Sequence, residues 1–195
     1  MKVLIIASPR SGSTNLYSYI KLSLGLVGYN EPHRTGNQQE RMIKYKSIRS
    51  NFKTAVVVKH LFMQIENIGF DNVEYFYDNI ENFYDKVILL HREDKQAASE
   101  SYAAAIKSGL WVNKYTYNDK VVPLKEKELA YKMFIKEAEF IKTLNYPVFT
   151  YEEIYYSDEG KDRLDKLLGI TDSKYRYKLD TKNRYRHNNL NKTII

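Results

Sequence analysis

Met1-Lys-Val-Leu-Ile-Ile-Ala-Ser-Pro-Arg-Ser-Gly-Ser-Thr-Asn15 opens the chain and decides its fold. The apolar run from Val3 to Ala7 gives way at once to a small, hydroxyl-rich turn. An apolar-periodic stretch begins at Leu16, so the pattern predicts a strand, a loop and a helix in succession. Such a loop directs backbone N–H groups and a helix N-terminus at one point, where a multiply charged anion binds.

The spacing Ala7-x-x-x-x-Gly12-Ser13-Thr14 nearly matches the P-loop pattern of nucleotide-binding proteins. Ser13 stands where that pattern has lysine, and Arg10 supplies a cation three residues earlier. Because that lysine is a main contact to the β- and γ-phosphates, we expect the loop to bind a phosphate-type group but not to hydrolyse ATP. The alternative is an ordinary turn whose Ser and Thr side chains only cap a helix.

The bulk properties favour one domain over residues 1–195, with a basic C-terminal segment at 174–195. The chain has no Cys, which excludes disulfides, thiolate zinc sites and a cysteine nucleophile. Its four His residues show no H-x-x-x-H spacing, so we expect no metal. The first apolar run is too short for a signal peptide or a membrane span, and we expect a cytoplasmic protein.

The formal net charge of +7 is concentrated near the C-terminus. Seven basic residues lie between Lys174 and Lys192 against one acid, Asp180, and three tyrosines are interleaved with them. Such a segment binds RNA or DNA, closes over a small anionic ligand, or is a solvated tail. Composition leaves all three interpretations open.

Strand and helix patterns alternate along the chain, which predicts an α/β fold with a central parallel sheet flanked by helices. The expected strands are short, mostly β-branched runs: Val3–Ile6, Ala55–Val58, Val87–Leu90 and Val148–Thr150. The expected helices are Thr14–Leu24, part of Gln38–Ser47, Asp94–Lys107, Lys125–Leu144 and Asp158–Leu168. Gly169 is expected to cap the last helix, and Thr150 to Glu153 to form a capping box.

Ligands of open parallel sheets bind beyond the carboxyl ends of the strands. Three cations follow predicted strands there: Arg10, Lys59 and Arg92. Since three cations at one edge are costly unless an anion neutralises them, we expect a ligand with two separate anionic groups.

Four segments together resemble the PAPS-dependent sulfotransferases, which have a P-loop NTPase-like fold. Ser8 to Thr14 resembles their 5′-phosphosulfate loop. Leu89 to Arg92, with Ser99 further on, resembles their 3′-phosphate motif. Val57 to Leu61 resembles a V-K-x-H strand end, although Lys59 and His60 are adjacent here. Thr150 to Ile170 resembles a further family stretch.

The resemblance implies transfer of a sulfuryl group from 3′-phosphoadenosine-5′-phosphosulfate (PAPS), leaving PAP as product and using no metal. It implies that the donor is bound by the loop, by a 3′-phosphate grip and by the tail. The donor-binding residues would be Arg10, Ser11, Gly12, Ser13, Thr14, Asn15, Arg92, either Ser99 or Ser101, Arg184 and Arg186. Arg10 and Lys59 would stabilise the leaving phosphate, and either Glu31 or His60 would be the base, with Glu31 favoured.

The expected acceptor is a small molecule or carbohydrate with a hydroxyl or amine group, and no membrane partner is expected. Two other functions remain as alternatives. A P-loop nucleotide kinase is the second choice, because the loop lacks the usual lysine. A nucleic-acid-binding protein acting through the basic tail is the third.

Overall fold

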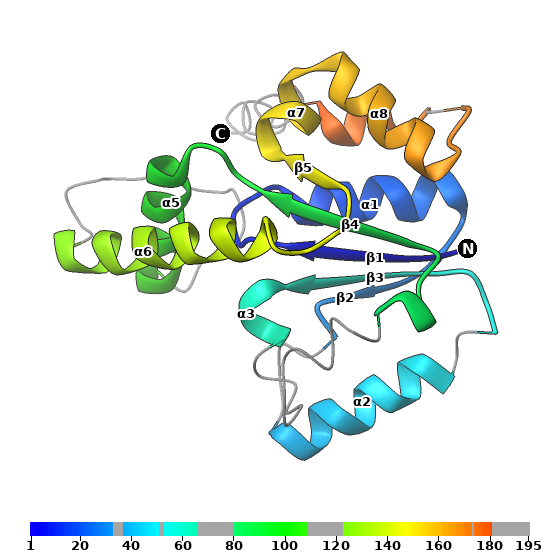
Figure 1. Cartoon of the computed structure of the whole chain (residues 1–195), viewed down its shortest axis with the longest axis horizontal. Helices are drawn as coiled ribbons and strands as arrows, with labels where there is room; N and C mark the ends of the chain where they lie inside the picture. The colour runs from blue at the N-terminus through cyan, green and yellow to red at the C-terminus, as the bar shows by residue number, and fades with distance from the viewer. Residues whose placement is uncertain (33–36, 51–52, 66–79, 109–122, 173, 181–195) are drawn as a thin grey trace, which may run out of the picture.

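The computed structural model describes residues 1–32, 37–50, 53–65, 80–108, 123–172 and 174–180. Within these residues, parallel strands form one five-stranded sheet in the order β2-β3-β1-β4-β5, with helices on both faces (Figure 1). The strands are β1 Lys2–Ala7, β2 Val27–Asn30, β3 Val56–Leu61, β4 Lys86–His91 and β5 Val148–Thr150. The predicted α/β fold is therefore confirmed.

The five predicted helices are present with small shifts at their ends, whereas the short α3, η2 and η4 were not predicted. They are α1 Ser13–Leu24, α2 Gln38–Ser50, α3 Phe62–Ile65, η2 Ile80–Asn82, α5 Lys95–Ser108, α6 Leu124–Ile141, α7 Tyr151–Tyr156, α8 Asp158–Leu168 and η4 Arg176–Leu179. Gly169 caps α8 in the left-handed conformation, as expected. The capping box is also present, because the Thr150 and Glu153 side chains each bond the other's backbone N–H.

Strand β2 was not predicted from the sequence. It is four residues long, neither of its ends is buried, and it contains glycine and asparagine, which are poor strand formers. A Cβ at Gly28 would lie 2.1 Å from the Tyr17 hydroxyl oxygen, so a larger residue would require the Tyr17 side chain to shift. Pairing with β3 therefore defines this strand, and it brings the residue after Asn30 to the edge of the sheet.

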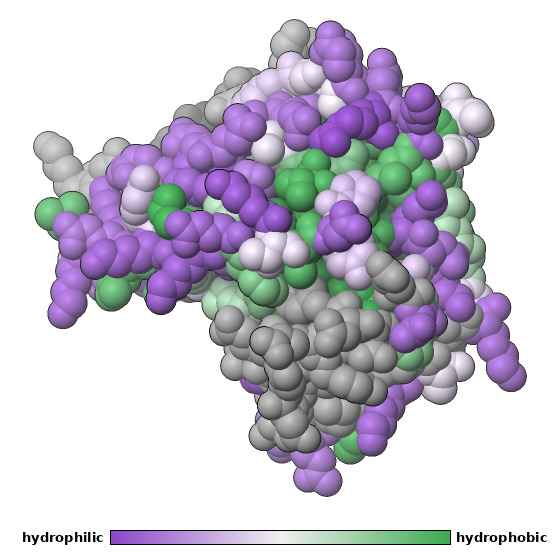
Figure 2. Space-filling model, viewed as in Figure 1, coloured by the Kyte–Doolittle hydropathy of each residue, from purple (hydrophilic) through white to green (hydrophobic). Residues whose placement is uncertain are grey.

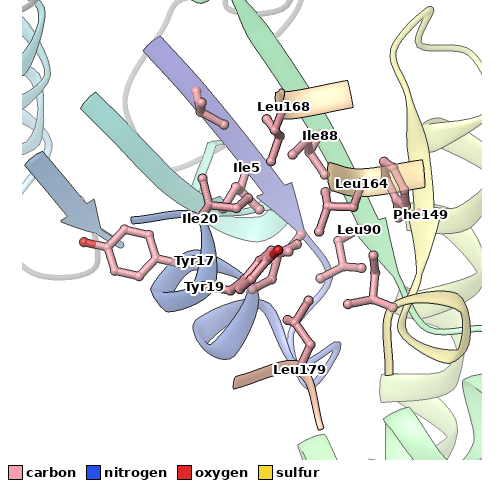
Figure 3. Packing of buried hydrophobic residues seen from close by; sticks show 14 of the residues in the cluster. Ile5, Tyr17, Tyr19, Ile20, Ile88, Leu90, Phe149, Leu164, Leu168 and Leu179 are labelled. Atoms are coloured by element: carbon pink, nitrogen blue, oxygen red, sulfur yellow. The ribbon is translucent and has the colours of Figure 1, made fainter. Parts of the chain in front are cut away.

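The core consists of two apolar layers, one on each face of the sheet. On one face, side chains of β1 and β4 pack against α1, α7, α8 and η4, including Ile5, Ile20, Leu164 and Leu179 (Figure 3). On the other, alternate residues of the same strands pack against α2, α3, η2 and α6. Burying each such side chain contributes roughly 1.5–3 kcal/mol, so the central strands are held firmly from both sides.

Helices α5 and α6 pack against each other and project beyond the sheet (Figure 1). The Tyr102 and Phe134 rings meet edge to face, with centroids 5.9 Å apart. Hydrophilic residues cover most of the visible side of this projection, with a few hydrophobic residues among them (Figure 2). In the described part of the chain, none of the helices has the length and apolar character needed to cross a membrane.

The start of the basic segment is tied to the core. Leu179 is fully buried, and Arg176 pairs with Asp162 and Asp165 of α8. The Tyr19 hydroxyl donates to Asp165 at 2.5 Å, and burial together with this bond raises the pKa of Tyr19. These contacts connect α1, α8 and η4, so η4 is held against the core.

Candidate functional site

The loop after β1 has a defined geometry at the carboxyl edge of the sheet. The Ser8 N–H donates to Leu90 of β4 at 2.8 Å, and the Ser11 hydroxyl donates to the Ser8 carbonyl at 2.6 Å. Arg10 and Gly12 both have positive φ, 62° and 75°. A positive φ is strained for arginine and easy for glycine, so packing holds this loop in its bend.

Helix α1 begins directly after this loop. Its N-cap is Gly12, which has no side chain to close the first turn. The alternative that Ser and Thr hydroxyls serve only as caps therefore does not describe this helix start. The Asn15 and Leu16 N–H groups bond back to the Gly12 carbonyl. The positive end of the helix dipole faces the space before Ser13 and Thr14, which is a favourable place for an anion.

Lys59 reaches the loop from the neighbouring strand β3. Its side chain is buried along the face of the sheet that carries α1. The ammonium Nζ lies 3.1 Å from Thr14 Oγ1 and 2.6 Å from Glu31 Oε1. The loop sequence lacks the usual lysine, but the fold brings a lysine to it from 45 residues away.

Glu31 follows β2 and is held by three contacts. Its φ is 49°, and its N–H donates to the Lys59 carbonyl at 2.9 Å. One carboxylate oxygen accepts from Lys59, and the other accepts from Gln64 Nε2 at 3.0 Å. Gln64 is itself fixed, since its Oε1 accepts the Leu61 N–H. No sequence motif marks Gln64, and the short helix α3 brings it to Glu31.

His60, the other candidate base, lies on the opposite side of the sheet from Lys59. Successive strand residues alternate between faces, and His60 falls in line with Val56 and Val58, which belong to the layer under α2 and α3. Its side chain is 1% exposed. The structure thus brings Lys59 and Glu31 together at the loop and directs His60 elsewhere.

The two serine candidates on α5 have different surroundings. Ser101 accepts a 2.8 Å hydrogen bond from Arg10 Nε, so it lies beside the loop. Ser99 is fully buried and donates to the Gln96 carbonyl within its own helix. Of the two, Ser101 is the one placed next to an expected anion-binding residue.

Arg92 stands at the end of β4, beside α7. Its Nε lies 3.8 Å from Glu152, and its guanidinium lies 4.9 Å from the centre of the Tyr151 ring. Glu152 also accepts the Glu93 and Asp94 N–H groups, at 2.9 and 3.4 Å. A carboxylate therefore stands beside the cation expected to bind the second anionic group.

His91 and Lys95 form a further basic pair beside Arg92. Lys95 Nζ lies 2.8 Å from His91 Nδ1 and donates to the Arg92 carbonyl. Burial, and then the Lys95 charge, lower the pKa of His91. Burial also lowers the pKa of Lys95, although the charges of nearby carboxylates act to raise it.

The three expected cations do lie at one edge, since β3, β1 and β4 are neighbouring parallel strands. Lys59 is paired with Glu31, and Arg92 is near Glu152. Carboxylates already offset two of these cations, so their charge alone does not require an anionic ligand. What remains is a preformed loop with a buried ammonium beside it.

A magnesium ion does not fit this arrangement. In P-loop NTPases the hydroxyl at the Thr14 position holds Mg²⁺. Here the Lys59 ammonium bonds both Thr14 Oγ1 and Glu31 Oε1, so a cation already occupies the place beside that hydroxyl. Within the described ranges, His, Asp and Glu form no cluster of three or more suited to a metal.

Two predicted residues, Arg184 and Arg186, lie outside the described residues. Asn15 lies in the first turn of α1, next to the loop. Two tyrosines of α7 also belong to the site, although the sequence singled out neither as a site residue. Tyr155 donates to the Gly12 carbonyl at 2.6 Å, and its ring centre lies 4.7 Å from that of Tyr151. The four-residue spacing of these tyrosines on a helix was the available signal.

Comparison with known proteins gives a likeness of fold. No family model and no curated protein matches the sequence. Shikimate kinase from Bacteroides thetaiotaomicron matches at a TM-score of 0.50 with 14% identity, covering 87% of this chain and 99% of that one. Shikimate kinase from Aquifex aeolicus matches at 0.50 and 13%, covering 87% and 97%. Deoxyadenosine kinase from M. mycoides has a TM-score of 0.46 and 14% identity, covering 87% and 100%.

These comparisons overturn the predicted sulfotransferase assignment. The similar structures are kinases with a P-loop fold, and the sequence matches no family model. The prediction of sulfuryl transfer from PAPS with PAP as product is therefore wrong. The physical reason is that a hydroxyl-rich loop before a helix N-terminus suits any multiply charged anion. Its short motif indicates the geometry without identifying the group transferred.

Proposed function

We propose that this chain binds the phosphates of a nucleotide at the loop of residues 8–14 and transfers a phosphoryl group to an acceptor hydroxyl. The observation that carries the proposal is the buried Lys59 ammonium, 3.1 Å from Thr14 Oγ1. The missing loop lysine was the main objection to this function. A lysine from β3 supplies that charge at the same loop.

The residues of the site suit the charges of such a transfer. Phosphoryl transfer depends chiefly on positioning and on neutralising negative charge. The N-terminus of α1 and the Arg10 guanidinium would bind the phosphates. Lys59 would neutralise charge on the bridging oxygen as the bond from that oxygen to the γ-phosphorus breaks and the nucleoside diphosphate leaves.

Glu31 is the proposed proton acceptor. The acceptor's oxygen forms the new bond to phosphorus, and its proton passes to the Glu31 carboxylate. Lys59 and Gln64 orient both Glu31 oxygens, at 2.6 and 3.0 Å. His60 is not proposed for this role, because it lies on the other face of the sheet. The acceptor remains a small molecule or carbohydrate in this proposal.

Calorimetric titration tests the binding step. Wild-type protein is titrated with ATP in EDTA, with ATP plus Mg²⁺, and with adenosine 3′,5′-bisphosphate. We expect ATP to bind in EDTA, because the cations that would contact its phosphates are the Lys59 and Arg10 side chains, which a chelator does not remove. Lys59→Met should weaken that binding at least tenfold, because it removes a charge-assisted contact to the phosphates. Lys86→Met, at the opposite end of β4, is the matched control and should bind as wild type.

The proposal would be refuted by an absence of ATP binding, or by clear preference for the 3′,5′-bisphosphate. ADP release in the presence of a panel of small hydroxyl compounds tests the transfer step. Glu31→Gln should abolish acceptor-dependent ADP release while ATP still binds. Undiminished release from Glu31→Gln would remove Glu31 as the base.

A further inference from the structure

We infer that Tyr155 is a positioning residue that holds the phosphate-binding loop in its binding conformation. This inference rests on the proposed function of that loop. Tyr155 lies on α7, 143 residues beyond Gly12, and its hydroxyl donates to the Gly12 carbonyl at 2.6 Å. Its side chain is 3% exposed, so neighbouring groups fix the hydroxyl in place.

The bonded carbonyl sets the direction of an N–H group. The peptide joining Gly12 to Ser13 is trans, and in a trans peptide the C=O and N–H point in opposite directions. The Gly12 carbonyl points toward Tyr155 and toward the Asn15 and Leu16 N–H groups. The Ser13 N–H therefore points out of the first turn of α1, toward the place proposed for a phosphate.

The ring of Tyr155 also restricts the loop. A Cβ on Gly12 would lie 2.6–2.9 Å from ring and hydroxyl atoms of Tyr155. Gly12 has a φ of 75°, which glycine adopts without strain. The ring thus packs against the Gly12 backbone, while the hydroxyl bonds its carbonyl. A rotation of this peptide would turn the Ser13 N–H away from the ligand and break the Tyr155 bond.

Tyr155 further connects the loop to Arg92. The Tyr155 and Tyr151 ring centres are 4.7 Å apart, and the Arg92 guanidinium lies 4.9 Å from the Tyr151 ring centre. Arg92, Tyr151, Tyr155 and Gly12 thus form a continuous series of contacts along the carboxyl edge of the sheet. Helix α7 holds the loop and Arg92 at a fixed separation.

Tyr155→Phe tests the inference, since it removes the hydroxyl and keeps the ring. Tyr156→Phe is the matched control: Tyr156 is 66% exposed, and its ring touches Tyr151 only at the edge. The probe is inorganic pyrophosphate. We expect Tyr155→Phe to bind pyrophosphate about fivefold more weakly, because it loses one hydrogen bond. Tyr156→Phe should bind pyrophosphate as the wild type does.

Amide NMR of the ligand-free protein gives a second reading that does not depend on binding. The Ser13 amide resonance should shift and exchange faster with solvent in Tyr155→Phe, while amides of α8 stay unchanged. An unchanged Ser13 amide, or unchanged pyrophosphate affinity with wild-type melting, would overturn the role of Tyr155. Failure of wild type to bind pyrophosphate would refute the proposed function, and the Ser13 amide would still decide the inference.

Discussion

The ion pair between Lys59 and Glu31 gives the sharpest prediction. Lys59→Met keeps an unbranched side chain of similar length but removes the charge. Glu31 would then lose its 2.6 Å partner while its side chain stays only 16% exposed. Removing one partner of a buried pair costs about 3–5 kcal/mol. Because Glu31 keeps Gln64 and some access to water, we expect the lower end, about 3 kcal/mol.

The reverse change should cost less. Glu31→Gln leaves Lys59 buried but still offers it an amide oxygen, so we expect a loss of about 2 kcal/mol. The double variant removes both charges, so no buried charge is left without its partner. Its loss should therefore stay at about 2–3 kcal/mol, with a coupling energy of about 2–3 kcal/mol between the two sites.

Urea unfolding of the wild type, the two single variants and the double variant at pH 7 measures these free energies. The slope of the free energy of unfolding against urea concentration should be the same for all four proteins. Lys86→Met should change the free energy of unfolding by less than about 0.5 kcal/mol. The reasoning fails if the two single costs add to within about 0.5 kcal/mol in the double variant. It also fails if Lys59→Met costs no more than the control.

Three further predictions concern other parts of the fold. Gly12→Ala should cost at least about 1–2 kcal/mol and weaken pyrophosphate binding, since it adds strain at positive φ and a clash with Tyr155; calorimetry and thermal melting measure both losses. Gly28→Ala should lower the melting temperature, and Tyr17→Phe should recover part of that loss by removing the clashing oxygen. The pKa of His91 is lowered by burial, so the unfolded chain takes up a proton first as the pH falls below about 6.5. The free energy of unfolding should therefore decrease between pH 7 and 5, and His91→Gln should flatten that slope in urea titrations.

Each of these three has an outcome that contradicts it. Wild-type affinity in Gly12→Ala would mean that the loop tolerates a different bend. If Gly28→Ala has the same melting temperature with and without Tyr17→Phe, the Tyr17 hydroxyl is not the group that clashes. A pH profile of stability that His91→Gln leaves unchanged would assign the acid sensitivity to other groups.

Local patterns in the sequence predicted most of the fold. The β-branched runs of β1, β3, β4 and β5 are buried on both faces, and such strands read as continuous apolar stretches. The capping box at Thr150 and the glycine cap at Gly169 were also readable, because each depends on a few neighbouring residues. Strand β2 was missed because its sequence has little strand preference of its own, and pairing with β3 defines it.

The function was misassigned for a related reason. The loop of residues 8–14 predicts an anion-binding turn, but short motifs in four segments do not identify the group transferred. The absence of lysine from that loop placed a kinase second to a sulfotransferase. Short local motifs do not show that Lys59 reaches the loop from another strand.

By itself, the sequence determined the order of strands and helices, the bend after β1 and the ends of several helices. Only the tertiary structure decided that Lys59 meets Thr14 across 45 residues, and that Tyr155 meets Gly12 across 143. Backbone preference and hydrophobic period act over a few residues, so they are readable along the chain. Contacts between distant side chains depend on which strands become neighbours, and the packing of the whole sheet sets that order.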